Sequence, residues 1–211
     1  MIGSFHSKYS SIGNQNRKQI VFALFLISTF VGCFTFNPRN SQRSLIIVSA
    51  TLEKDEPIVD ELFQSHFHNV TLKSGEKEIS YTKKSGHYYY FQNLTAGQYE
   101  LGSLVHYLNR GIAGNPQINR DGLLTLEPPL TQEDRLKTLV NLEPGSVLFL
   151  GEIQVKAMIR TREPIQIQAT YSKSPEAERR ALNHLIRNYP RSGWAELAKD
   201  RLKALGTISL Q

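Results

Sequence analysis

The feature that most constrains the fold is a regular alternation of apolar and polar residues late in the chain. From Val147 to Ile159 every second residue is apolar or glycine, and Glu152, Gln154 and Lys156 occupy positions between them. Successive side chains of a β-strand point to opposite faces, so this pattern predicts a strand with one buried and one solvated face. The same alternation continues in residues 165–171.

Earlier segments show the same period. They are residues 79–81, 89–91 and 99–105, and the β-branched run of residues 45–52 is typical of a buried strand. No convincing helical pattern separates these segments, which disfavours βαβ units and a parallel sheet. The sequence therefore predicts a mainly β domain at residues 44–172, an antiparallel two-sheet sandwich of about seven strands.

One turn of this domain resembles a known family. Residues 91–101 read FQNLTAGQYEL, which is similar to the F-x-x-L-x-x-G-x-Y-x-L turn of carboxypeptidase-regulatory-like, or prealbumin-like, sandwich domains. The physical reading agrees with the resemblance. Gly97 permits a backbone bend closed to residues with a β-carbon, Leu94 fills the end of the core, and Tyr99 restarts the inward alternation.

A cationic and then apolar stretch precedes the β domain. Arg17 and Lys18 come before an apolar run that extends from Ile20 to Val31 and is followed by Gly32 and Cys33, the only cysteine. This order of a charged region, a short apolar region and a small residue is typical of a secretory signal. The run is marginal for a permanent span, which needs about 20 apolar residues, and ample for a cleaved signal.

Residues 30–33, FVGC, resemble the lipobox of bacterial lipoproteins in the relaxed form of spirochaete lipoproteins, with Phe30 where Leu is usual. The resemblance implies that the Cys33 sulfur carries a diacylglycerol and that the signal peptide, residues 1–32, is removed. Neither residue after Cys33 is the aspartate of inner-membrane lipoproteins, which implies a lipid-anchored place in the cell envelope, at the outer membrane. An uncleaved single-span anchor, and an ordinary signal or a buried cysteine, stay open.

The charge of the chain does not indicate nucleic-acid binding. The whole chain carries +6, but residues 1–32 hold three cations and no acid, so removing them leaves 22 minus 19, or +3. One cysteine permits no intramolecular disulfide, so the domain relies on its core. Residues 37–44 are polar with one proline, and residues 33–43 are predicted to form a tether between the membrane and the domain.

The end of the chain changes to a helical pattern. Ser174 followed by Pro and Glu is a typical helix start, and Pro190 ends the apolar stripe that follows. Ser192 caps a second helix that Gly206 is expected to end. Residues 173–211 therefore predict a helical hairpin, whose sequence NYPRSGWAELAKDRL resembles the junction of tetratricopeptide-like repeats in bacterial envelope proteins. One such pair cannot bury its own faces, so it packs on the sandwich or on another protein, and the first is favoured.

Histidines and tyrosines are the candidate chemical groups. His66 and His68 would share a strand face, which suggests a metal-dependent enzyme or metal carrier as a third hypothesis, but a solvated strand face is favoured. His87 and His106 are expected on a sheet surface. Residues 88–90, three tyrosines, are expected in the core rather than on an aromatic recognition face.

No motif indicates catalysis. There is no G-x-S-x-G, and Gly111 and Gly114 are too close together to form a phosphate loop. Two irregular stretches, residues 107–121 and 128–135, are candidate partner surfaces. We therefore predict a non-enzymatic envelope lipoprotein with no cofactor and no bound metal, in contact with the membrane through lipid on Cys33 and with an unidentified protein partner. The alternative is a single-span membrane protein whose β domain is a subunit of an envelope complex.

Overall fold

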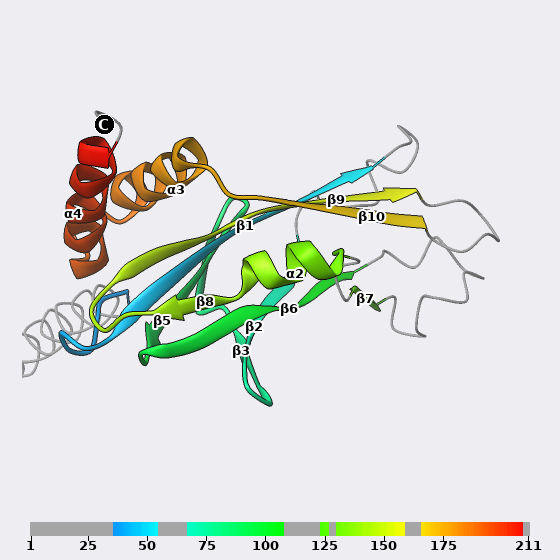
Figure 1. The fold of residues 1–211 in the computed structure, drawn as a ribbon, viewed down its shortest axis with the longest axis horizontal. Coiled ribbons are helices and arrows are strands. Elements are labelled where there is room, and N and C mark those ends of the chain that lie inside the picture. Colours follow the sequence, from blue (N-terminus) through cyan, green and yellow to red (C-terminus); the bar gives the residue numbers. More distant parts are fainter. Residues whose placement is uncertain (1–35, 55–66, 108–122, 127–129, 159–165, 209–211) are drawn as a thin grey trace, which may run out of the picture. The chain divides into compact units, whose positions relative to one another are not determined.

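The computed structural model describes residues 36–54, 67–107, 123–126, 130–158 and 166–208, and those from Asn37 onward belong to one compact unit. These residues form a mainly β structure, as predicted (Figure 1). Its elements are β1 (Ser44–Lys54), β2 (Asn69–Ser74), β3 (Lys77–Ser80), β4 (Lys83–Ser85), β5 (Tyr88–Leu94), β6 (Gly97–Tyr107), β7 (Leu123–Leu126), α2 (Gln132–Thr138), β8 (Val140–Leu142), β9 (Val147–Met158), β10 (Gln166–Ser172), α3 (Pro175–Asn188) and α4 (Gly193–Ile208). The predicted signal peptide and Cys33 lie outside the described residues.

The strands of the described residues form two sheets of five. Sheet A has the order β10-β9-β1-β5-β4, and sheet B has the order β3-β2-β6-β7 with β8 paired to β6. The prediction of about seven strands is wrong: β2 was not predicted, and β4, β7 and β8 are three or four residues long, too short to show a period of two.

The centre of sheet A contains a parallel pair, so the prediction of a purely antiparallel sandwich is wrong there. β1 and β9 run in the same direction, with Leu45 beside Val147 and Lys54 beside Ala157. A parallel pair needs a long crossover, which is usually helical. Here the crossover between β1 and β9 consists of strands of both sheets. The absence of a helical pattern between them therefore did not exclude a parallel pair.

Side chains of both sheets meet in one apolar core. Ile46 of β1, Leu72 of β2 and Leu104 of β6 are fully buried in it. Tyr89 lies in the same core, and its hydroxyl donates to the carbonyl of Phe67 at 2.6 Å. The two sheets therefore pack face to face, and the three tyrosines of residues 88–90 are buried as predicted.

The opposite face of sheet A is buried as well. Leu45, Ile47, Tyr90 and Phe149 are almost fully buried, yet they alternate with the side chains of the sandwich core and lie outside it. Both α3 and α4 contact β9 (Figure 1). Sheet A thus lies between sheet B and the two helices, and burial on both faces explains why β1 is an unbroken apolar run.

β-bulges interrupt the two longest alternating stripes. The register between β9 and β1 shifts at Phe149/Gly151, so Phe149 lies outside the sandwich core whereas Leu150 and Ile153 belong to it. The prediction that the whole stripe shares one face is therefore wrong. A second register shift, where β6 pairs with β2, precedes His106, which is buried rather than on a sheet surface as predicted.

The helices follow their capping residues. The hydroxyl of Ser174 accepts from the backbone of Ala177 at 3.1 Å, which confirms the predicted start of α3. α4 continues past its predicted end at Gly206, which has open space around it and no positive φ. α2 begins after Thr131, inside a stretch predicted to be irregular, because seven residues are too few to show a helical period.

Candidate functional site

The α3–α4 pair is joined to sheet A by aromatic residues and a histidine. The hydroxyl of Tyr90 and Nδ1 of His184 are 2.8 Å apart. The rings of Tyr88 and His184 lie 4.4 Å apart, and the rings of Tyr90 and Tyr189 meet at nearly a right angle. Trp194, the only tryptophan, is fully buried. Within the described residues the pair therefore packs on its own domain, and we name this contact the docking interface.

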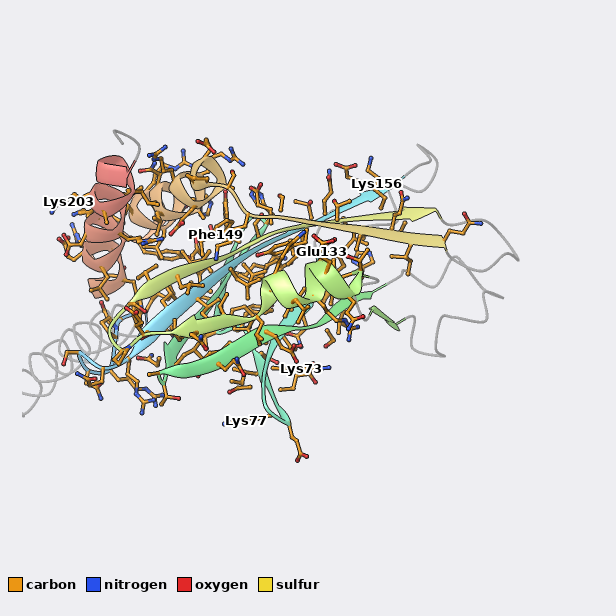
Figure 2. All side chains as sticks on the ribbon, viewed as in Figure 1. Lys73, Lys77, Glu133, Phe149, Lys156 and Lys203 are labelled. Carbon is orange, nitrogen blue, oxygen red and sulfur yellow. The ribbon has the colours of Figure 1, made fainter. Side chains whose placement is uncertain are left out.

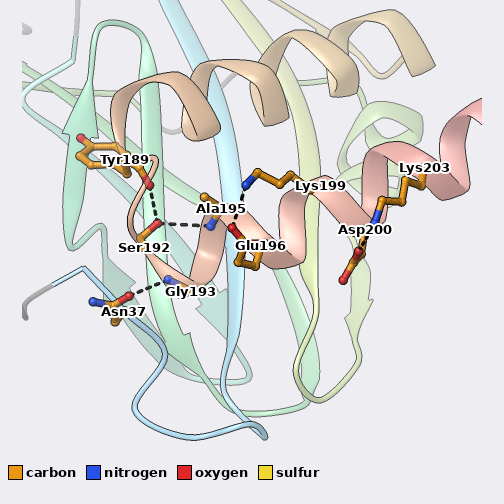
Figure 3. A network of polar contacts seen from close by, with 9 residues as sticks. All are labelled: Asn37, Tyr189, Ser192, Gly193, Ala195, Glu196, Lys199, Asp200 and Lys203. Atoms are coloured by element: carbon orange, nitrogen blue, oxygen red, sulfur yellow. Dashed lines mark hydrogen bonds and ion pairs between the residues drawn. The ribbon is translucent and has the colours of Figure 1, made fainter.

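The chain before β1 belongs to the same interface, although sequence analysis assigned it to a tether. The side-chain oxygen of Asn37 accepts from the backbone of Gly193 at 2.6 Å (Figure 3), and a β-carbon on Gly193 would lie 3.0 Å from the Pro38 ring. The backbone of Arg39 donates to the Asn93 side chain at 2.7 Å. These contacts hold the segment against both α4 and the end of β5.

One ion pair joins α3 to sheet A and another joins α3 to α4. Arg180 of α3 donates to both carboxylate oxygens of Glu152 at 3.1 and 3.2 Å. Arg201 of α4 donates to both oxygens of the buried Glu178 at 2.7 and 3.4 Å, and this hydrogen bonding raises the Arg201 pKa. Two-point contacts of this kind fix orientation more tightly than a single charge pair.

The two histidines of this region favour the neutral form. Burial lowers the pKa of His184, and the charges of Arg187 and His87 lower it further. Burial also lowers the pKa of His87, where Glu152 opposes the change. A neutral His184 with its proton on Nε2 accepts the Tyr90 hydroxyl at Nδ1, so the neutral form suits the docked geometry.

A groove of about 430 Å³ lies between α4 and the turn from β8 to β9. This volume is within the range of small-ligand and side-chain pockets. The carboxylates of Glu143 and Asp200 supply negative charge, and Asp200 also pairs with Lys203 at 3.0 Å (Figure 3). The full lining is Asn141, Glu143, Gly145, Ser146, Val147, Leu148, Leu197, Asp200 and Arg201.

No sequence pattern predicted this groove. Its walls come from two segments that are more than 45 positions apart in the chain, and each of its residues is of an ordinary type for a turn or a helix face. The helix was predicted, but no local pattern encodes its proximity to the turn from β8 to β9. The groove is therefore a product of the docking interface.

The candidate residues from the sequence do not form a single site: Tyr88 and Tyr90 lie in the docking interface, where they contact His184. Cys33, His66 and residues 108–121 of the first candidate partner surface lie outside the described residues. His68 is half-buried, its ring lies 6.0 Å from that of His106, and burial lowers its pKa. Among the residues that the structure describes, no group of three or more His, Cys, Asp or Glu side chains is placed to hold a metal ion.

No family model matches the chain, and it matches no curated protein and no solved structure. The fold and site define a mainly β domain with a packed helical pair and a groove beside it. The resemblances to lipoproteins, to prealbumin-like domains and to tetratricopeptide-like repeats stay predictions. Within the described ranges, no helix is long and apolar enough to cross a bilayer.

Proposed function

We propose that this chain is an envelope lipoprotein, held on the outer membrane by lipid on Cys33, that binds a protein partner without catalysis. The observation that carries the proposal is the order of residues from Arg17 to Cys33, with cations, an apolar run, a small residue and then the single cysteine. Acyl chains contribute about 0.8 kcal/mol per buried methylene, so two or three of them hold a domain of this size on a bilayer.

The finer fold proposal is a prealbumin-like sandwich with a helical hairpin. Its support is the turn between β5 and β6, where Leu94 is buried and Gly97 has a φ of +151°. The hydroxyl of Tyr99 donates to the carbonyl of Thr95 at 2.8 Å, which fixes the turn as the chain crosses from sheet A to sheet B.

The groove supports the binding role. Its aliphatic residues, Val147, Leu148 and Leu197, offer an apolar surface, and it is also lined by Glu143 and Asp200. The Arg201 charge is neutralised by Glu178. A protein segment with a basic side chain matches this lining, since its charge would meet Glu143 and compete with Lys203 for Asp200.

The anchor is tested by growing cells with a labelled fatty-acid analogue. We expect the wild-type protein to take up label and the Cys33→Ala variant to take up none. Label in the variant would contradict the lipid anchor. The mass of the mature amino terminus tests the single-span alternative, because an intact Met1 is incompatible with processing before Cys33.

The groove is tested by crosslinking in intact cells with two charge reversals on one helix. Asp200 and Glu196 each pair with a lysine three residues later, but only Asp200 lines the groove. We expect Asp200→Lys to lose the partner crosslink and Glu196→Lys to keep it. Equal crosslinking by both variants would exclude the groove as the partner site.

A further inference from the structure

We propose that the domain meets the lipid surface with one particular end, and that arginines of this end bind the phosphates of the headgroups. The end consists of residues 37–43, 93–97, 143–146 and 189–193, and we name it the entry end. This inference rests on the proposed lipid anchor at Cys33 and adds the orientation of the domain and its contact with the membrane.

The covalent connection between the lipid on Cys33 and the domain is short. Only three residues separate Cys33 from Asn37, the first residue of the compact unit. A fully extended chain spans at most about 3.6 Å per residue, so Asn37 lies within about 14 Å of the Cys33 α-carbon. A lipid-bearing Cys33 therefore brings the entry end close to the headgroups.

The chain after Asn37 is hydrogen-bonded to the domain, so it cannot serve as a spacer between the domain and the membrane. Asn93 holds it through three contacts: its side chain accepts from the backbone of Arg39, its amide donates to the carbonyl of Asn37, and its carbonyl accepts from Arg43. The hydroxyl of Ser44 then donates to the Glu143 carbonyl at 2.6 Å. Lifting the domain off the membrane would require breaking these bonds.

The long strands begin at the entry end and extend away from it. β1 and β9 both begin at the entry end and run parallel, and at about 3.3 Å per residue the eleven steps of β9 extend about 36 Å. β6 also begins there, at Gly97. The far ends of these strands, Lys54, Tyr107 and Met158, therefore point away from the lipid surface. Figure 2 shows Lys156 toward the end of β9 that lies away from α4.

The entry end carries more positive than negative charge. The four segments of the entry end contain Arg39, Arg43 and Arg191 against a single acid, Glu143. Arg39 and Arg191 are exposed. A guanidinium matches a phosphate with paired hydrogen bonds, and each basic residue near an anionic surface strengthens attraction about fivefold.

The orientation is tested with the lipidated full chain in vesicles of phosphatidylethanolamine and phosphatidylglycerol. Single cysteines are introduced by Ala96→Cys at the entry end and by Gln168→Cys on β10, which lies beside Lys156, and both positions are exposed. Each is labelled with bimane and quenched by a lipid with a spin label on its headgroup. Given a strand length of about 36 Å, we expect quenching at position 96 to exceed that at position 168 at least about threefold. Equal or reversed quenching would overturn the orientation.

The wild-type chain separates a failure of this inference from a failure of the proposed function. Cys33 is its only cysteine, so the thiol reagent labels wild type only if Cys33 is free of lipid. Labelled wild type would overturn the anchor itself. Unlabelled wild type together with equal quenching at both positions would overturn the orientation alone.

The arginine contact has its own test. The double variant Arg39→Glu, Arg191→Glu is compared with the control Lys73→Glu, Lys156→Glu, whose lysines lie outside the entry end. We expect quenching of the label at position 96 to fall about twofold or more in the first variant and to stay unchanged in the control. Unchanged quenching in both would overturn the contact between arginine and phosphate.

Discussion

At the scale of single residues, backbone conformation explains residue types that the alternation of apolar and polar side chains does not explain. Gly151 lies at the bulge of β9 with a φ of +151°. A β-carbon there would lie 2.5 Å from the ring of Tyr171 and 2.9 Å from the carbonyl of Ser172. The Tyr171 hydroxyl in turn donates to the carbonyl of Leu150 at 2.6 Å, so the ring cannot move aside without losing this bond.

We therefore expect Gly151→Ala to lower the free energy of unfolding by about 2 kcal/mol, from overpacking and backbone strain. The matched control is Gly206→Ala in α4, where a β-carbon meets nothing within 4 Å and helix propensity favours alanine by up to about 1 kcal/mol. Urea denaturation of a fragment that begins at Asn37 measures both. If Gly151→Ala leaves the free energy of unfolding unchanged, the bulge can accommodate a β-carbon beside Tyr171, and the prediction is wrong.

Two substitutions of Asn93 separate the energetic cost of backbone strain from that of lost hydrogen bonds. It is the one non-glycine residue with positive φ among the described residues, at +60°, and its side chain makes two hydrogen bonds to the segment before β1. Asn93→Gly keeps the backbone conformation and loses these bonds, at about 1–2 kcal/mol. Asn93→Ala adds the cost of a left-handed alanine, about 1 kcal/mol more. Denaturation midpoints should fall in that order, and an alanine variant as stable as the glycine variant would contradict the argument.

At the scale of elements, the sequence predicted what local chemistry decides. The cap at Ser174 and the apolar run of β1 were identified correctly because their signals lie within a few residues. The bulge at Gly151 was missed because it depends on Tyr171, which lies twenty positions later and packs against it. The parallel pairing of β1 and β9 was missed because it depends on the path of the intervening strands.

The docking interface should depend on pH. The folded-state pKa values of His184 and His87 lie below 6.5, so the folded form binds fewer protons than the unfolded form near that pH. Linkage then predicts that their contribution to stability is fully present above pH 6.5 and is lost as the pH falls below it toward the folded-state pKa values. The buried Trp194 reports unfolding of this interface by its fluorescence.

We expect the urea midpoint from Trp194 emission to fall between about pH 7.5 and about pH 5, and to fall less in His184→Gln, which cannot take up a proton. Tyr90→Phe is the companion variant. It removes the hydroxyl bonded to His184 and leaves the titrating ring, so it should lower the midpoint at both pH values. An identical pH dependence in wild type and His184→Gln would assign the effect to other groups.

At the scale of the whole molecule, the candidate site arises from the arrangement of elements. The sequence predicted the helical pair and favoured its packing on its own domain. It could not place α4 beside the turn from β8 to β9, because the docking surface consists of side chains from β1, β5 and β9 on one face of sheet A. The groove and the entry end both result from the packing of the helical pair on sheet A.

The packing of α3 and α4 on sheet A predicts what happens when the two helices are removed. In a chain that ends at Ser172, the outer face of sheet A would expose Leu45, Ile47, Tyr90 and Phe149, all now almost fully buried. Exposing a large apolar side chain costs about 1.5–3 kcal/mol. Four of them cost about 6–12 kcal/mol, which is comparable to the whole stability of an ordinary domain.

We therefore expect the fragment 37–172 to bind 8-anilinonaphthalene-1-sulfonate strongly, to elute as aggregates in size-exclusion chromatography and to lose its near-ultraviolet circular dichroism. The control is the fragment 37–208, which keeps both helices and should behave as the longer chain does. A second variant, Ile47→Lys, Phe149→Gln in fragment 37–172, replaces apolar side chains of the exposed face by polar ones and should reduce aggregation. If fragment 37–172 instead stays monomeric with an ordered spectrum, sheet A does not need the helices, and the docking interface contributes far less than its burial implies.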